Sequence, residues 1–230
     1  TLPQDFLLTN VQANANGVGG LSLNTSGTTL LKNVAADANT VFGLSATNPY
    51  LADTKQGITI LASRFNANQL LGAQVTTSGA AVLNGVSASY SSTQFGMQIS
   101  ASDPLFPTEK VEILSSLGKN YFDGNGSSGL MVLDSKSFTA SYLSVRNNGQ
   151  SIATPGMVLG GDGIPMTLTC TVVTGHPGDG MQVGIGDALL KIVNGMVEGN
   201  ARLDPDAYQN IRLNDAETTL QLLPGVCSGW

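Results

Sequence analysis

Three aspartates in this sequence, Asp53, Asp103 and Asp134, carry the side chains that hydrolysis of a glycosidic bond requires. Such hydrolysis uses two carboxyl groups about 5–5.5 Å or about 6.5–9.5 Å apart, and a linear sequence does not fix that separation. Cleavage by elimination would instead need a basic proton acceptor beside calcium-binding carboxylates, for which Lys136 or Arg146 is a candidate. None of these residues stands in a recognisable catalytic motif, so the sequence alone assigns no catalytic residue.

Two insertions carry the first two aspartates together with aromatic and charged side chains. They span residues 47–56 and 102–110. Aromatic rings and carboxylates side by side would suit a groove that holds a sugar polymer or a protein partner. In the alternative interpretation, both insertions pack against the protein and only cover one of its flanks. The candidate groove residues are Tyr50, Lys55, Phe106, Glu109 and Lys110.

A weaker pattern resembles a calcium-binding loop, in which oxygen ligands stand at positions 1, 3, 5 and 12. Position 6 departs from the pattern because Ser128 replaces the glycine that the sharp turn needs. The favoured interpretation is a turn followed by a strand whose Val132 points inward, and no cofactor is expected. The weak calcium candidates are Asp123, Asn125, Ser127 and Asp134.

The histidine and the cysteines favour structural roles. His176, the single histidine, lies in a turn flanked by glycine and proline, where we expect an exposed side chain and no part in a Ser-His-Asp site. Zinc is not expected, because one histidine and two distant cysteines supply too few ligands. Cys170 and Cys227 allow one disulfide, which would anchor the C-terminal tail and favour an oxidising compartment. Two buried thiols are the alternative.

The elements that position these residues follow from a repeat. A glycine, an apolar residue, an outward residue and a second apolar residue recur in this order, which is the period-2 pattern of a short strand with one buried face. The first five intervals are 23, 29, 24, 33 and 27 residues long, within the range of solenoid repeats. The copies begin at Gly20, Gly43, Gly72, Gly96, Gly129, Gly156 and Gly180, with a degenerate last copy at Asn210.

An apolar stretch and a turn precede each copy, and in this pattern the chain resembles the right-handed parallel β-helix family, the pectate-lyase-like fold. Asn10, Asn33 and Asn84 stand at or beside that family's tight bend, where a left-handed backbone is wanted, while Ser63 and Ser116 interrupt the asparagine stack. The resemblance implies an all-β, right-handed parallel β-helix of about eight coils over residues 6–215. It also implies that catalytic carboxylates, if present, lie near the glycine-led strand, but the fold itself assigns no activity.

One domain is expected over residues 1–230, with coils over 6–215 and a cap and tail over 216–230. Each coil of a solenoid contacts only its neighbours, so both ends need covers. Residues 203–208 depart from the repeat and, with the tail, are expected to cap the C-terminal end. No amphipathic helix or charged lid precedes Phe6, so we expect other copies or flanking domains to cover the N-terminal end.

The composition excludes several classes of partner. The net charge is −6, the isoelectric point is about 4.5, and no basic stripe could neutralise phosphates, so nucleic acid and anionic membranes are not expected as partners. No apolar run approaches the roughly 18 residues of a membrane span. Charged residues make up 11%, against roughly 25% in a typical soluble domain.

The favoured interpretation is a secreted or cell-surface structural or adhesive module without enzymatic activity, which stacks end to end or belongs to a longer surface protein. It rests on the low charge, the open N-terminal end and the lack of a catalytic motif. One alternative is a polysaccharide lyase or glycoside hydrolase with its groove on the side of the β-helix. Another is a glycan-binding module that uses Tyr50 and Phe106 without turnover.

Overall fold

The computed structural model describes residues 4–48, 56–100, 109–151, 153–161, 163, 165–200, 210–224 and 226–227. Regular secondary structure within these ranges consists of β-strands alone. Over the same ranges, no helix has the length and hydropathy of a membrane span. The fold is all-β, as the composition indicates.

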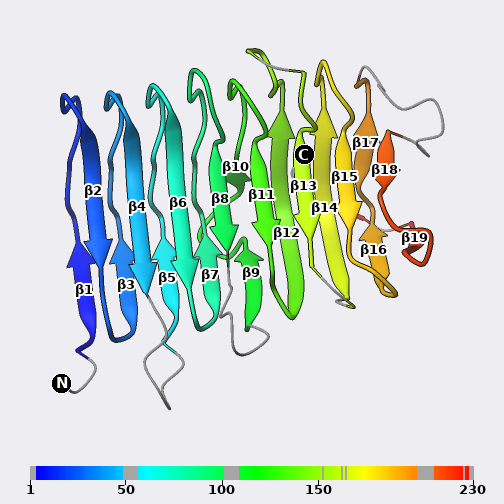
Figure 1. Ribbon diagram of the computed structural model, residues 1–230, viewed down its shortest axis with the longest axis horizontal. Coiled ribbons are helices and arrows are strands. Elements are labelled where there is room, and N and C mark those ends of the chain that lie inside the picture. Colours follow the sequence, from blue (N-terminus) through cyan, green and yellow to red (C-terminus); the bar gives the residue numbers. More distant parts are fainter. Residues whose placement is uncertain are drawn as a thin grey trace.

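The glycine-led repeats form one parallel sheet of eight strands, seen in front in Figure 1. Each copy of the repeat supplies one strand, and neighbouring copies pair in register. The strands are β2 (Gly19–Asn24), β4 (Phe42–Asn48), β6 (Leu71–Thr77), β8 (Met97–Ser100), β11 (Leu130–Leu133), β13 (Met157–Gly160), β15 (Met181–Gly184) and β18 (Ile211–Leu213).

The apolar stretches between the repeats form a second parallel sheet. Its main path contains β1 (Phe6–Thr9), β3 (Thr29–Lys32), β5 (Ile58–Leu61), β7 (Ala81–Asn84), β9 (Lys110–Leu114), β12 (Ser137–Arg146), β14 (Met166–Thr174), β16 (Leu189–Val193) and β19 (Thr219–Leu223). The short strands β10 (Asn120–Tyr121) and β17 (Met196–Glu198) pair with β12 and β14.

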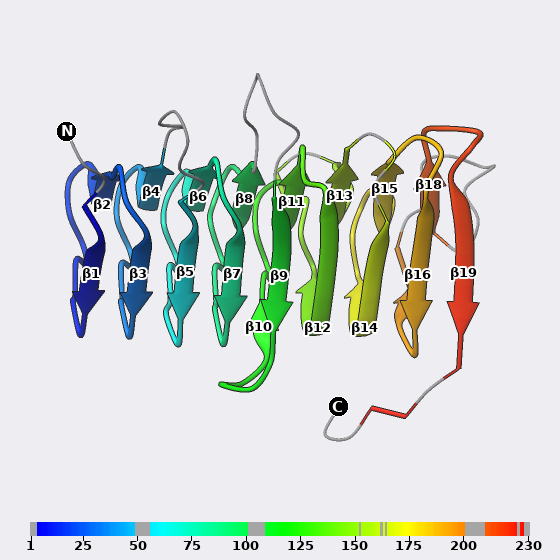
Figure 2. The same ribbon diagram turned by 90° about the horizontal axis from the view of Figure 1, so that it is seen from below.

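The chain alternates between the two sheets, so the described part is a parallel β-solenoid of about seven turns from β2 to β18. Figures 1 and 2 together show a right-handed winding, the hand that parallel crossovers almost always take. The fold expected from the repeat is therefore confirmed. Strand pairing also continues through β19, beyond residue 215.

The core consists of inward-facing apolar side chains that stack from coil to coil. Val75, Ile99 and Val132 are neighbours in one such row, and all three are fully buried. Burying a side chain of this size contributes about 1.5–3 kcal/mol. The inward position of Val132 agrees with the turn-and-strand interpretation of the segment that contains it.

A left-handed residue bends the chain after the strands of the second sheet, as the resemblance implied. Asn10 (φ 58°) and Asn33 (φ 52°) occupy this position in the first two coils. In the fourth coil the left-handed residue is Gly85 (φ 66°), so Asn84 lies one residue before it. The Asn84 side chain instead accepts a hydrogen bond from the backbone N–H of Leu117 at 2.8 Å.

A disulfide joins Cys170 to Cys227, 57 residues later in the sequence. Cys170 is the left-handed residue of β14, and its side chain is buried. The bond ties the segment after β19 to a strand two positions away in the same sheet, beyond β16. It therefore holds the C-terminal segment against the side of the solenoid.

Candidate functional site

Five candidates lie outside the described ranges: the groove residues Tyr50, Lys55 and Phe106 and the catalytic candidates Asp53 and Asp103. The structure does place the strands from which both insertions leave. These strands, β4 and β8, lie on either side of β6. Their C-terminal ends are therefore roughly 10 Å apart, on the same side of the solenoid. The groove itself stays a prediction.

Four other candidates lie near the end of β8. The turn that contains Asp134 follows β11, and Leu133 of that strand is the direct neighbour of Ser100. Lys136 donates its backbone N–H to the Glu109 carbonyl oxygen at 3.2 Å. The Asp134 turn and the start of β9, with Glu109 and Lys110, therefore lie side by side.

The four calcium candidates do not share one site. Asp123, Asn125 and Ser127 precede β11, whereas Asp134 follows it, so the length of a four-residue strand separates them. The Asn125 side chain donates to Asn148, and the Ser127 hydroxyl lies 3.3 Å from that of Thr154. Among the described residues, no group of three or more His, Cys, Asp or Glu side chains could hold a metal ion.

Asp123 links two neighbouring coils. Its carboxylate accepts the Ser144 hydroxyl at 3.0 Å and the backbone N–H of Arg146 at 2.7 Å. Burial raises the pKa of this carboxyl group, and the hydrogen bonds from Ser144 and Arg146 oppose the rise. Asp123 thus has a structural role that the calcium-loop pattern did not indicate.

Inside the bend that precedes each glycine-led strand runs a ladder of polar side chains, one per coil. The backbone and side-chain N–H groups of Asn39 both donate to Oδ1 of Asn68, at 2.9 and 3.0 Å. Asn125 donates in the same way to Asn148, at 2.8 and 2.9 Å. We call this series the amide ladder; its members are Asn16, Asn39, Asn68, Ser91, Asn125, Asn148, His176 and Asn200.

The ladder explains why most repeats begin with glycine, although at Gly72 the close neighbours are backbone oxygens of Gly96 and Phe65. A Cβ atom added to Gly43 would lie 2.6 Å from Nδ2 of Asn68, and one added to Gly129 would lie 2.5 Å from Nδ2 of Asn148. Real Cβ atoms do not approach other atoms so closely. The glycine therefore leaves room for the ladder side chain of the following coil.

His176 is buried, so the expectation of an exposed turn residue is wrong. Its side chain is 2% exposed and occupies the ladder position between Asn148 and Asn200. The sequence contained a signal for this: Asn16, Asn39, Asn68, Asn125 and His176 each stand four residues before a repeat glycine. Burial lowers the pKa of the imidazole, and contacts with the Asn148 and Val145 backbones oppose that shift.

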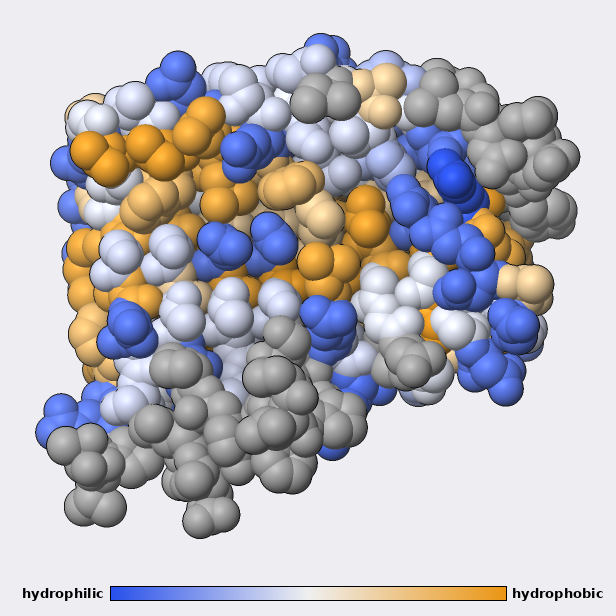
Figure 3. All heavy atoms as spheres, viewed as in Figure 1, coloured by the Kyte–Doolittle hydropathy of each residue, from blue (hydrophilic) through white to orange (hydrophobic). Residues whose placement is uncertain are grey.

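The outer face of the eight-stranded sheet carries no carboxylate along its central row. This is the face in view in Figure 3. The row consists of Ser22, Ser45, Gln74, Gln98, Met131, Val158, Gln182 and Arg212, which are neighbours in register. Acid catalysis on this face would thus depend on residues of the insertions or of the Asp134 turn.

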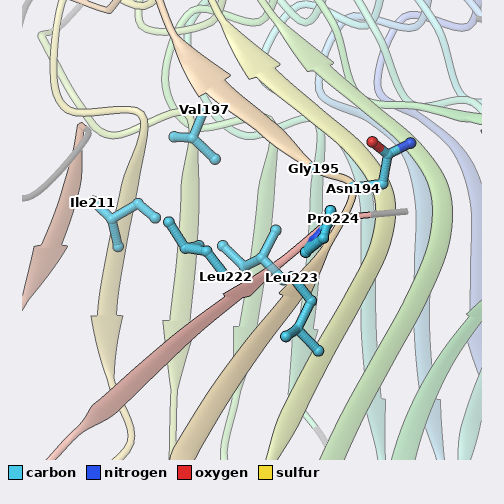
Figure 4. Close-up of a pocket in the computed structure, with 8 residues that line it drawn as sticks. Asn194, Gly195, Val197, Ile211, Leu222, Leu223 and Pro224 are labelled. Atoms are coloured by element: carbon cyan, nitrogen blue, oxygen red, sulfur yellow. The ribbon is translucent and has the colours of Figure 1, made fainter. Parts of the chain in front are cut away.

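Two hollows lie elsewhere on the described surface. One, of about 340 Å³, follows the left-handed bends and is lined by Arg64, Lys119 and the 42% exposed Tyr121, among others. The other, of about 280 Å³, lies at the C-terminal coils, where Figure 4 shows apolar side chains such as Ile211 and Leu222 around it. Neither contains a pair of carboxylates.

No family model and no curated protein matches the chain. Two solved structures resemble it in fold. One is the A-module of mannuronan C-5 epimerase AlgE6 from Azotobacter vinelandii, with 14% identity, a TM-score of 0.40, and coverage of 96% of this chain and 65% of that one. The A-module of AlgE4 from the same organism has 13% identity, a TM-score of 0.30, and coverage of 93% and 63%.

The chain thus spans less than two thirds of either structure to which it is similar. Its own strand pairing defines the class: this is a parallel β-helix protein.

Proposed function

We propose that the protein is a non-enzymatic structural or adhesive module of the cell exterior, extended at its N-terminal end by further β-strands. The disulfide supports an oxidising compartment. The amide ladder supports a structural role, because it uses the buried polar side chains to join coils. The lack of carboxylates along the central outer row of the eight-stranded sheet supports a module without turnover on that face.

The main support for the proposal is the structure of the first coil. Within the described residues, β1 and β2 stand at the ends of their two sheets, so one edge of each has no strand beside it. Phe6, Leu8 and Leu21 point into the solenoid but are only partly buried, whereas Leu31 in the next coil is completely buried. Unpaired strand edges beside half-covered apolar side chains are a template for pairing with another chain.

The first member of the amide ladder could bond to a further coil in the same way as later members do. Where the ladder residue is asparagine, its Oδ1 accepts N–H groups from the coil before, as Oδ1 of Asn39 does from Asn16. Over the described part of the chain, no coil precedes Asn16. A further coil would therefore meet a matching acceptor as well as two strand edges.

Replacing the inward Leu8 by lysine is expected to abolish end-to-end association. The buried ammonium would have to lose its hydration in a row of apolar side chains, which is unfavourable without a partner. The matched control is Leu7→Lys on the same strand, because Leu7 points outward and is 65% exposed. Light scattering and electron microscopy of both variants measure the effect, with thermal unfolding as a check on folding.

The proposal predicts concentration-dependent oligomers for wild type and Leu7→Lys and a folded monomer for Leu8→Lys. If the wild-type chain stays monomeric at high concentration, or if both variants assemble equally, the N-terminal end is not the docking surface.

Glycan binding is the second candidate, favoured by the hollow beside Tyr121, where an exposed ring could stack on a sugar with Arg64 and Lys119 nearby. We expect incubation with a panel of polysaccharides to give no turnover. Turnover that is lost in Asp103→Asn or Asp134→Asn would contradict the structural proposal. Binding without turnover that is lost in Tyr121→Ala would favour the glycan-binding alternative, and binding lost in Tyr50→Ala plus Phe106→Ala would place it at the insertions.

A further inference from the structure

The His176 ring reproduces the hydrogen bonds of an asparagine amide. Its Nδ1 accepts the backbone N–H of Asn148 at 3.0 Å, as Oδ1 of Asn148 accepts that of Asn125 at 2.8 Å. Its Nε2 lies 3.0 Å from the Val145 carbonyl oxygen, as Nδ2 of Asn148 lies 2.8 Å from that of Phe122. His176 can therefore stand in for asparagine.

Histidine can make the hydrogen bonds of asparagine in only one protonation state of its ring. Nδ1 must lack a proton to accept from Asn148, and Nε2 must carry one to donate to Val145, so the ring is neutral. A second proton on Nδ1 would point at the N–H of Asn148 and leave that buried donor without an acceptor. The Asn148 carbonyl oxygen, at 3.4 Å, is farther from Nδ1 than the N–H is.

The ring has little space in which to rearrange. A Cβ atom added to Gly156 would lie 2.0–2.4 Å from three of its atoms, so the imidazole lies directly against the backbone. Among the described residues, the charged groups on the elements packed around it are Arg146 at the end of β12, the buried Asp179 of its own turn and Glu198 at the end of β17. The recorded ring contacts go to neutral backbone groups.

We propose that His176 is an acid-sensitive link in the amide ladder. The neutral ring joins the turn before β15 to Val145 of β12 and to the turn before β13, and the protonated ring loosens the C-terminal coils. An amide has no titratable proton near neutral pH, so the Asn39–Asn68 and Asn125–Asn148 steps stay closed under the same conditions. Acid therefore weakens the solenoid at one defined position.

Burial lowers the pKa of His176 from its ordinary value of 6.5. The unfolded chain consequently binds a proton at higher pH than the folded chain does. The stability that the neutral ring contributes is complete above pH 6.5 and is lost as the pH falls through the folded-state pKa. Between pH 6.5 and the folded-state pKa, the equilibrium constant for unfolding rises by up to tenfold for each unit by which the pH falls.

His176→Asn is the matched variant, because asparagine restores the residue found at the neighbouring ladder positions. We expect equilibrium unfolding between pH 8 and pH 4.5 to show a steeper loss of stability below pH 6.5 in the wild type than in His176→Asn. The amide of Asn148 should lose protection from hydrogen exchange over the same range in the wild type, while the amide of Asn125 should keep it.

Nitrogen-15 chemical shifts of the wild-type imidazole provide a measurement that needs no variant. The proposal expects a ring that carries its proton on Nε2 at pH 7 and titrates below 6.5. A ring that titrates at 6.5 or above, or a His176→Asn protein with the wild-type acid slope, would overturn it. Neither result bears on assembly through the N-terminal end, which is tested separately.

Discussion

Asn148→Ala is expected to lower the free energy of unfolding by about 4 kcal/mol. The Asn148 side chain accepts two N–H groups of Asn125, at 2.8 and 2.9 Å, and donates to the Phe122 carbonyl oxygen at 2.8 Å. Asn148 and Asn125 are both completely buried. Each buried partner left without a hydrogen bond costs roughly 1–3 kcal/mol, and a water molecule that enters the space would recover part of the sum.

Urea unfolding of Asn148→Ala and Asn14→Ala makes the comparison. Asn14 also accepts a hydrogen bond from the next coil, from the N–H of Asp37 at 2.8 Å, but its side chain is exposed. Water replaces the lost bond there, so Asn14→Ala should change the free energy of unfolding by less than about 1 kcal/mol. Equal losses in the two variants would show that the amide ladder does not hold the coils together.

Loss of the Cys170–Cys227 disulfide is expected to cost about 4 kcal/mol of stability. The bond closes a loop with a sequence separation of 57 residues, and restricting a chain of this length lowers the entropy of the unfolded state by that amount in the chain-entropy model. The measurement is the thermal midpoint of the protein with and without reductant. Cys227→Ala should lower the midpoint as far as reduction does.

The matched control is Cys227→Ala measured with and without reductant. Adding reductant to Cys227→Ala should change nothing further, because no second disulfide is available: the chain has only two cysteines. If reduction leaves the wild-type midpoint unchanged, the bond does not stabilise the solenoid. The proposal that the protein lies in an oxidising compartment would then lose its main support.

The repeat predicted the fold because a solenoid translates local pattern directly into structure. Each glycine-led copy became a strand of one sheet, down to the degenerate copy that forms β18. Inward and outward positions alternate within the strand, so the burial of Val132 followed from the period alone. The parallel order of the strands then placed the C-terminal ends of β4 and β8, from which the two insertions leave, on the same side of the solenoid.

The amide ladder was missed because its members lie in turns, where no hydrophobic period marks the buried face. Polar residues in a turn are usually exposed, so the sequence predicts an exposed His176. The structure shows that the turn points its side chain inward against Gly156. Only the fixed distance of four residues to the next glycine indicated this, and that distance has no meaning before the stacking is known.

The candidate site was predicted only in outline. Sequence reasoning grouped Asp123 with Asp134 by a loop spacing, but β11 separates them and Ser144 already engages Asp123. Glu109 and the turn that contains Asp134 lie side by side through the pairing of β9 with β12, which the sequence spacing does not reveal.

The most direct test of the proposed function is amide hydrogen exchange of the 230-residue chain as a function of its concentration. If the N-terminal end binds a second copy, amides of β1 (Phe6–Thr9) and β2 (Gly19–Asn24) will gain protection as the concentration rises, because their free edges become paired. Amides in β12 and β14, which are flanked by strands on both sides, will not change. Protection that is independent of concentration, or that grows elsewhere without a change in β1 and β2, would contradict the account.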